Sequence, residues 1–136
     1  MQQLAARRVR TRLDQPGAAP PADAPVVLFV SDDENLREAA QRVLRREGFD
    51  VVTAGHAGHA VLACLNGGRI DVLATELAMR DTTGAALADR LRRYQRDLPV
   101  VYLAGAGTPE SVGVVVRPFT RDDLVRALDL ALAAAF

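Results

Sequence analysis

Short apolar runs alternate with helix-like segments from Val26 onward. The runs are rich in Val, Ile and Leu and are bounded by Gly, Pro, Asn or acidic residues. Such continuous apolar runs are typical of strands that are buried on both faces of a sheet. The predicted strands are Val26–Ser31, Val51–Ala54, Ile70–Thr75, Pro99–Ala104 and Gly113–Val116.

Between these runs, apolar residues recur at the three- and four-residue spacing of amphipathic helices. The third predicted helix covers Gly84–Arg96, with Tyr94 facing inward. Thr120 opens the last helix, and Asp123 completes a capping box with it. Gly48 stands where the first helix needs a C-cap. The apolar stripes of the first, second and last helices are Leu36, Ala39, Ala40, Val43 and Leu44; Ala57, Ala60, Val61, Cys64 and Leu65; and Leu124, Ala127, Leu128, Ala131, Leu132 and Ala135.

Strict alternation of strand and helix predicts an α/β domain with parallel strands and helices on both faces. For five strands we expect a doubly wound, flavodoxin-like sheet in the order 2-1-3-4-5. The first and third strands are then neighbours, which brings Asp32 and Glu76 together at the carboxyl edge of the sheet. Only Gly105–Val112 separate the last two strands, so the fourth helix is expected to be shortened to a turn at most.

Composition separates residues 1–25 from the predicted domain at 26–136. The first segment carries Arg7, Arg8, Arg10 and Arg12 and ends in a Pro/Ala-rich stretch, which is typical of a linker. The 17 basic and 17 acidic residues cancel, which argues against nucleic-acid or membrane binding by the chain as a whole. With one Cys and no long apolar run, we expect a cytoplasmic protein.

Four stretches, taken in order, resemble the receiver domain of bacterial two-component response regulators. That resemblance implies a phosphoryl group carried on an aspartate, with Mg²⁺ held by acids and the phosphoryl oxygens contacted by a lysine and a hydroxyl. It also supports the predicted strand order. The four stretches are Val27–Asp33, Asp71–Met79, Leu98–Ala104 and Val116–Phe119.

Most of the residues that would carry this chemistry in a receiver are altered here. Glu76 stands at the phosphorylated position, and Ala104 stands at the hydroxyl position. In the acidic pocket, Ser31 replaces the first acid, Asp32 remains, and Asp33 is adjacent. The remaining changes are Arg117 for the lysine, Val114 for the aromatic residue before it, and Arg80 for a proline.

These changes predict a degenerate receiver that is not an enzyme. We expect no cofactor, or at most weak Mg²⁺ binding by Asp32 and Glu76, and a Glu76–Arg117 ion pair that fills the site. An alternative role for Glu76 is to imitate the phosphorylated state. The expected partner is a protein of a signalling pathway, not nucleic acid or membrane. The sequence does not give the oligomeric state.

The residues leave two alternative functions. The first is a phosphoacceptor receiver with unusual ligands in a two-component phosphorelay. The second is a nucleotide-binding enzyme, which is disfavoured because Ser31–Asp33 stand where a Gly-rich fingerprint belongs. His56 and His59 are interpreted as exposed residues at a helix start, Gly105–Gly107 as a flexible loop, and Cys64 as a core residue.

Overall fold

The computed structural model describes residues 22–66, 68–109 and 111–134 of the 136-residue chain. The linker predicted at 1–25 therefore lies largely outside the described residues. The strands are β1 Val26–Val30, β2 Asp50–Ala54, β3 Val72–Glu76, β4 Val100–Ala104 and β5 Val114–Val116. The helices are α2 Glu34–Arg46, α3 Ala57–Asn66, α4 Gly84–Leu91 and α5 Arg121–Ala134.

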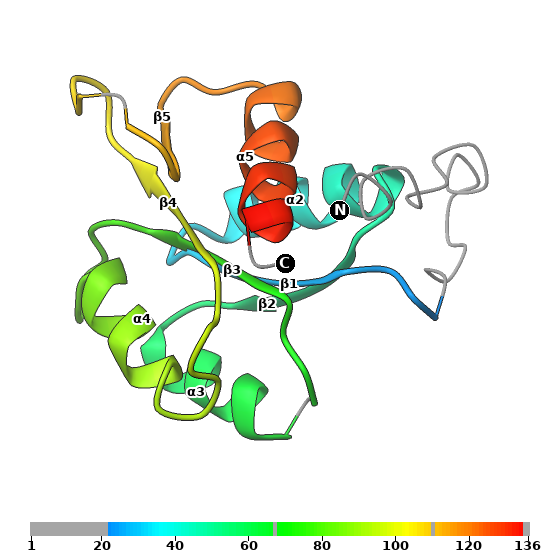
Figure 1. The fold of residues 1–136 in the computed structure, drawn as a ribbon. Coiled ribbons are helices and arrows are strands. Elements are labelled where there is room, and N and C mark those ends of the chain that lie inside the picture. Colours follow the sequence, from blue (N-terminus) through cyan, green and yellow to red (C-terminus); the bar gives the residue numbers. More distant parts are fainter. Residues whose placement is uncertain (1–21, 67, 110, 135–136) are drawn as a thin grey trace.

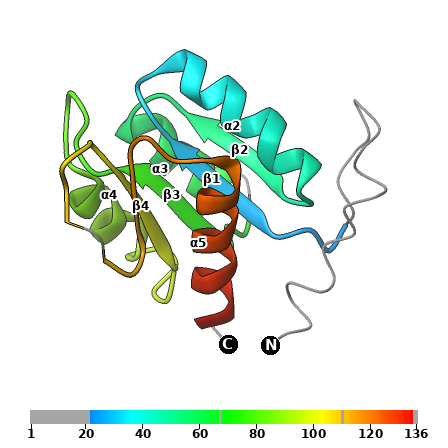
Figure 2. The same cartoon turned by 90° about the horizontal axis from the view of Figure 1, so that it is seen from above.

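The strands form one five-stranded parallel sheet in the order β2-β1-β3-β4-β5, which confirms the predicted fold class. Helices α2 and α5 cover one face of this sheet, and α3 and α4 lie on the other (Figures 1 and 2). Because all strands are parallel, their carboxyl ends meet at one edge. The register places Val30 of β1 beside Thr75 of β3, so the loops after both strands begin side by side.

Two apolar clusters hold the layers together, one on each face of the sheet. Phe29 and Leu44 belong to the cluster under α2 and α5, and neither has measurable exposure. Leu28 and Cys64 belong to the cluster under α3 and α4, so the prediction of a core cysteine is confirmed. Burial raises the pKa of the Cys64 thiol.

The structure corrects the bounds of several predicted elements and the orientation of Leu65, which is 54% exposed. β3 begins at Val72 and includes Glu76, two residues later than predicted at its start. α4 ends at Leu91, not Arg96, and Tyr94 is 55% exposed, so its predicted inward orientation is wrong. The chain turns away because the Gln95 side chain bonds the Ile70 backbone, accepting from N–H at 2.9 Å and donating to the carbonyl at 2.7 Å.

The helix ends follow local sequence signals. The predicted capping box is present: the Asp123 N–H donates to Thr120 Oγ1, and the Thr120 N–H donates to the Asp123 carboxylate. Gly48, just beyond α2, has φ 96°, a conformation that favours glycine. Gly84 opens α4 so close to β3 that a Cβ there would lie 2.4 Å from the Glu76 carbonyl oxygen.

The connection between β4 and β5 contains no helix in its described residues, 105–109 and 111–113. This agrees with the prediction that Gly105–Val112, between the last two strands, form at most one helical turn. As a result, the strand face on the side of α3 and α4 is open at β5: Val114 and Val116 are only half-buried, and Val112 is 98% exposed. Within the described part of the chain, no helix has the length and apolar character needed to cross a membrane.

Candidate functional site

The candidate site lies at the carboxyl edge of the sheet, where β1, β3 and β4 end. Three elements bring its central residues together: Ser31 follows β1, Glu76 ends β3, and Arg117 follows β5. Ser31 has no measurable exposure, and Glu76 is 9% exposed. A buried carboxylate requires compensation by charge or hydrogen bonds, so its partners decide what it can do.

Both carboxylate oxygens of Glu76 are engaged. The Arg117 guanidinium donates to Oε1 in a close ion pair, as predicted from the sequence. The Ser31 hydroxyl donates to Oε2 at 2.6 Å. One carboxylate therefore joins the ends of β1 and β3 to the segment after β5.

Ser31 is itself held in place from two directions. Its hydroxyl oxygen accepts from the Asp33 N–H at 3.0 Å. Its carbonyl accepts from Arg37 Nη1 at 2.6 Å, which ties the end of β1 to α2. Sequence reasoning did not single out Arg37, because its role depends on how α2 lies on the sheet and not on its place within the helix.

The two aspartates after Ser31 have different surroundings. Asp32 Oδ2 accepts from the Arg80 N–H at 3.2 Å, and the Arg80 Nε lies 3.9 Å from the same oxygen. Asp33 is exposed and caps α2, since its Oδ1 accepts from the Leu36 N–H at 3.2 Å. The structure thus brings Glu76, Ser31 and Arg117 into direct contact and gives Asp32 and Asp33 other partners.

Two further predicted positions, Ala104 and Val114, carry apolar side chains. Ala104 ends β4 and is buried, and its carbonyl accepts from the Arg117 N–H at 3.0 Å. Val114 opens β5 opposite Tyr102 of β4. The Arg117–Pro118 peptide bond is cis. The edge therefore offers no hydroxyl at Ala104 and no aromatic ring at Val114.

The donor set does not fit the Mg²⁺ ion that a receiver resemblance implies. Mg²⁺ requires oxygen ligands in a near-octahedral arrangement. Here both oxygens of Glu76 already have donors, and Asp32 shares its Oδ2 with Arg80. Among the residues that the structure describes, no group of three or more His, Cys, Asp or Glu side chains is placed to hold a metal. Guanidinium groups supply the positive charge at this edge.

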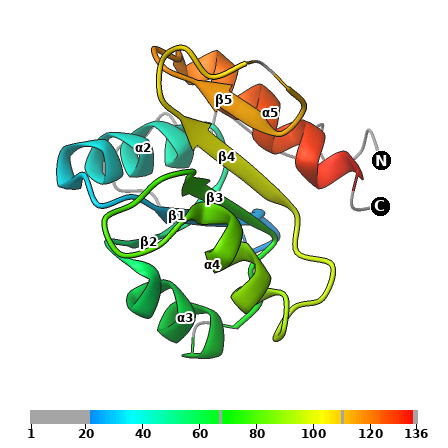
Figure 3. The same cartoon turned by 90° about the vertical axis from the view of Figure 1, so that its left-hand side faces the viewer.

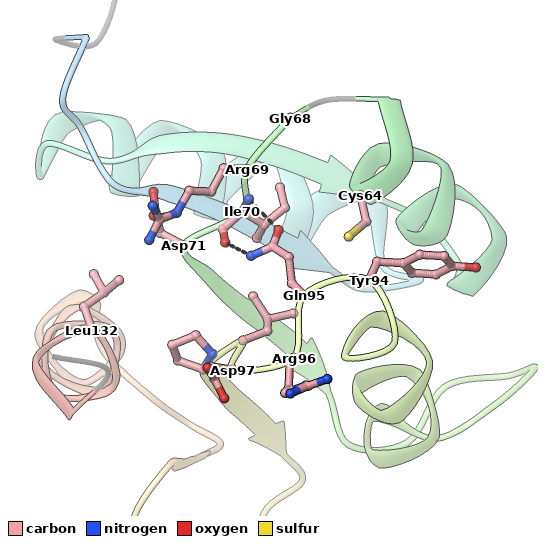
Figure 4. A pocket seen from close by; sticks show the side chains of 12 residues that line it. Cys64, Gly68, Arg69, Ile70, Asp71, Tyr94, Gln95, Arg96, Asp97 and Leu132 are labelled. Atoms are coloured by element: carbon pink, nitrogen blue, oxygen red, sulfur yellow. Dashed lines mark hydrogen bonds and ion pairs between the residues drawn. The ribbon is translucent and has the colours of Figure 1, made fainter.

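A separate cavity of about 640 Å³ lies at the opposite, amino-terminal edge of the sheet (Figure 4). Gln95 crosses it to reach Ile70, and Arg69 pairs with Asp71 at 3.1 Å. Gln95, Arg69 and Asp71 are thus already paired within the chain. Because it opens on the far edge from Glu76, it does not share the candidate site.

The two histidines lie outside both regions. His56 and His59 are exposed, with ring centroids 4.1 Å apart. The His56 Nδ1 accepts from the His59 N–H at the start of α3, at 3.3 Å. Their predicted position at a helix start is confirmed.

The sequence is similar to known receiver domains. Residues 27–129 match the model of the response regulator receiver domain. The transcriptional regulatory protein GlrR of Escherichia coli is 30% identical over 78% of this chain and 26% of its own length. The transcriptional regulatory protein CseB of Streptomyces coelicolor is 35% identical over 70% of this chain and 39% of its own. The chain thus spans well under half of these relatives.

Solved structures show the same fold. The chemotaxis protein CheY4 of Vibrio cholerae superposes with a TM-score of 0.73, at 23% identity, over 80% of this chain and 99% of its own. At that identity the likeness concerns the fold alone. It agrees with the strand order of the sheet.

Proposed function

Because the chain belongs to the response regulator receiver domain family, we propose that it acts in bacterial two-component signalling as a protein-interaction module that does not depend on phosphorylation. The observation that carries this proposal is the engagement of both Glu76 carboxylate oxygens, by Arg117 and by Ser31. In this role the domain binds a protein partner and catalyses no reaction of its own.

A phosphoacceptor carboxylate must attack phosphorus with a free oxygen while cations neutralise the phosphoryl oxygens. Glu76 has no free oxygen, and the cation beside it, Arg117, is already paired with the carboxylate. Its oxygens are held by donors, it is 9% exposed, and the acids beside it do not complete a Mg²⁺ site. Its extra methylene also displaces the carboxylate by about 1 Å, a misplacement that costs roughly 10²-fold in rate.

We assign Glu76 the role of joining the strand ends and not that of imitating a phosphoryl group. Such imitation needs a route from the site to the rest of the domain. In the family resemblance that route uses a hydroxyl and an aromatic ring, and Ala104 and Val114 supply neither. The Glu76–Arg117 pair nevertheless holds the segment after β5 in one position.

The alternative is a phosphoacceptor receiver with unusual ligands. It is favoured by one observation, that Asp32 and Glu76 both lie at the carboxyl edge, after β1 and at the end of β3. Incubation of the full chain with acetyl phosphate and Mg²⁺, followed by intact mass measurement, separates the two functions. We expect no phosphoryl group on the wild-type chain and none on Glu76→Asp, since the other altered groups remain and act together.

A variant with Ser31→Asp, Glu76→Asp, Ala104→Thr and Arg117→Lys serves as the matched control. It restores the receiver-like groups on the same backbone, and we expect it to gain one phosphoryl group. Gain by the wild-type chain would establish the alternative function. Gain by Glu76→Asp alone would show that the longer side chain is the only defect and that the remaining substitutions do not disable the site.

A further inference from the structure

The free edge of the sheet beside α5 forms a groove of about 890 Å³. β5 is the last strand of the sheet and lies alongside α5 (Figure 3). One wall of the groove is the outer edge of β5 with the residues just before it, and the other is a row of α5 side chains. The groove is distinct from the Glu76 site, since none of Glu76, Ser31 and Arg117 lines it.

Within the described residues, some backbone groups of β5 have no hydrogen-bond partner on this side. The Gly113 carbonyl and the Arg117 N–H bond to β4, at 2.8 Å and 3.0 Å. Because groups alternate along a parallel strand, those of Val114 and Val116 face away from β4. The Val114 N–H donates to the Ser111 carbonyl, so the Val114 carbonyl and both groups of Val116 face the groove.

The α5 wall is apolar and has room above it. Ala127 and Ala131 are half-buried, and Leu130 is 60% exposed. Val112, at the mouth of the groove, is 98% exposed. Alternate side chains of an added strand would lie over Ala127 and Ala131, while its backbone pairs with β5.

Charge at the groove points to one kind of occupant. Among the described residues, two charged side chains line it, Asp123 and Arg126. The Asp123 carboxylate is used in the cap of α5. Arg126 is exposed, and within the described part of the chain no hydrogen bond or ion pair engages it. A carboxylate on the occupant would complement it.

We propose that an extended, apolar segment of a partner protein, carrying an acidic residue opposite Arg126, adds to β5 as a sixth strand. This inference rests on the proposed function, in which the domain acts by binding a protein. It adds the surface at which that protein binds, the groove between β5 and α5. A helix would leave the Val116 backbone groups unpaired. The β5 of a second copy, within Ser111–Val116, has no acid for Arg126.

The test is a titration of the full chain with an acetylated peptide of alternating valine and threonine that carries one glutamate, followed by amide chemical shifts. No phosphodonor or Mg²⁺ is present, so the result is independent of the phosphorylation experiment. We expect saturable shifts confined to Val112–Arg117 and Arg126–Ala134. The same peptide with N-methylated backbone groups should not bind, because it cannot pair with a strand edge.

Two substitutions sharpen this test. Val116→Pro removes the N–H that would donate to the added strand. It should weaken binding by about tenfold, because one hydrogen bond between β5 and the peptide is lost. Arg126→Glu should weaken binding of the glutamate peptide and improve binding of a lysine counterpart. Arg90→Glu, an exposed change on α4 across the sheet, is the matched control and should leave both affinities unchanged.

Three outcomes would overturn the proposal. Equal binding of the N-methylated peptide would show that strand pairing is not involved. Shifts outside the two segments, or no saturable shift, would place the partner surface elsewhere. A doubled mass of the free chain in light scattering that Val116→Pro abolishes would show that a second copy occupies the edge. Since Arg126→Glu changes an exposed side chain, it keeps the test decisive even if Val116→Pro fails to fold.

Discussion

Two parts of the sheet differ in how helices cover them: β1 and β3 form the closed half, and β5 forms the open half. β1 and β3 lie between helices on both faces, and their residues are almost all fully buried, as Val27–Val30 and Val72–Ala74 illustrate. β5 is covered on the α5 side only, and Val114 and Val116 are half-buried. The difference follows from one short connection, because a crossover without a helix leaves the next strand's outer face open. The closed half therefore holds fully buried strand residues, and the open half leaves one strand face partly exposed.

The Glu76–Arg117 pair joins these halves. Glu76 ends a fully buried strand, whereas Arg117 follows the open one. The Arg117 guanidinium and the Ser31 hydroxyl engage both oxygens of Glu76, so the segment after β5 is tied to the ends of β1 and β3.

The largest expected effect is a core truncation in the closed half. Phe29→Ala should lower the free energy of unfolding by about 3–5 kcal/mol, because a fully buried ring leaves a cavity. Val116→Ala in the open half should cost only about 0.5–1 kcal/mol. Urea denaturation of both variants measures the contrast. Equal losses would mean that the two halves are equally packed.

The next effect concerns the contact of α4 with β3. Gly84→Ala should destabilise the chain by about 1–3 kcal/mol, since its Cβ would meet the Glu76 carbonyl oxygen at 2.4 Å. Gly105→Ala is the matched control, because a Cβ there meets nothing within 4 Å. Thermal melts of both variants check the prediction, and a Gly84→Ala variant as stable as wild type would show that this approach is not tight.

The third effect tests the pair that joins the halves. Arg117→Ala should cost about 1–3 kcal/mol, because Glu76 is 9% exposed and loses its cation. Arg80→Ala removes a cation that is 89% exposed and should cost about 0–1 kcal/mol. Denaturation at low and high salt compares them. A cost for Arg80→Ala as large as that for Arg117→Ala would contradict the assignment of Glu76 as the central carboxylate.

The smallest expected effect is that of Mg²⁺ on the wild-type chain. A ligand that binds only the folded state raises stability, by about 2.7 kcal/mol at a concentration of 100 Kd. Because Arg117 and Ser31 engage both oxygens of Glu76, and Asp32 Oδ2 accepts from the Arg80 N–H with the Arg80 guanidinium 3.9 Å away, we expect no shift of the melting temperature by millimolar Mg²⁺. Stoichiometric binding in a calorimetric titration would refute this expectation. The variant with Ser31→Asp, Glu76→Asp, Ala104→Thr and Arg117→Lys is the positive control.

Sequence patterns were reliable where the interaction is local or where charge leaves few choices. The capping box of Thr120 and Asp123 lies within four residues, and both of its bonds are present. The Glu76–Arg117 pair was predictable because the resemblance put two opposite charges at one edge. Tyr94 was misplaced because helical spacing continues past Leu91, whereas the Gln95 bonds to Ile70 end the helix.

The sequence alone determined the order of strands and helices, the short fourth connection and the residue types at the site, because these depend on local pattern and composition. Only the tertiary structure decided that the Ser31 hydroxyl donates to the second oxygen of Glu76, 45 residues away. It likewise decided that the Arg80 N–H donates to Asp32, 48 residues away. It also decided that Asp33 caps α2 and that β5 faces an open groove. Such pairings depend on where each strand ends in space, and no spacing along the chain encodes that distance.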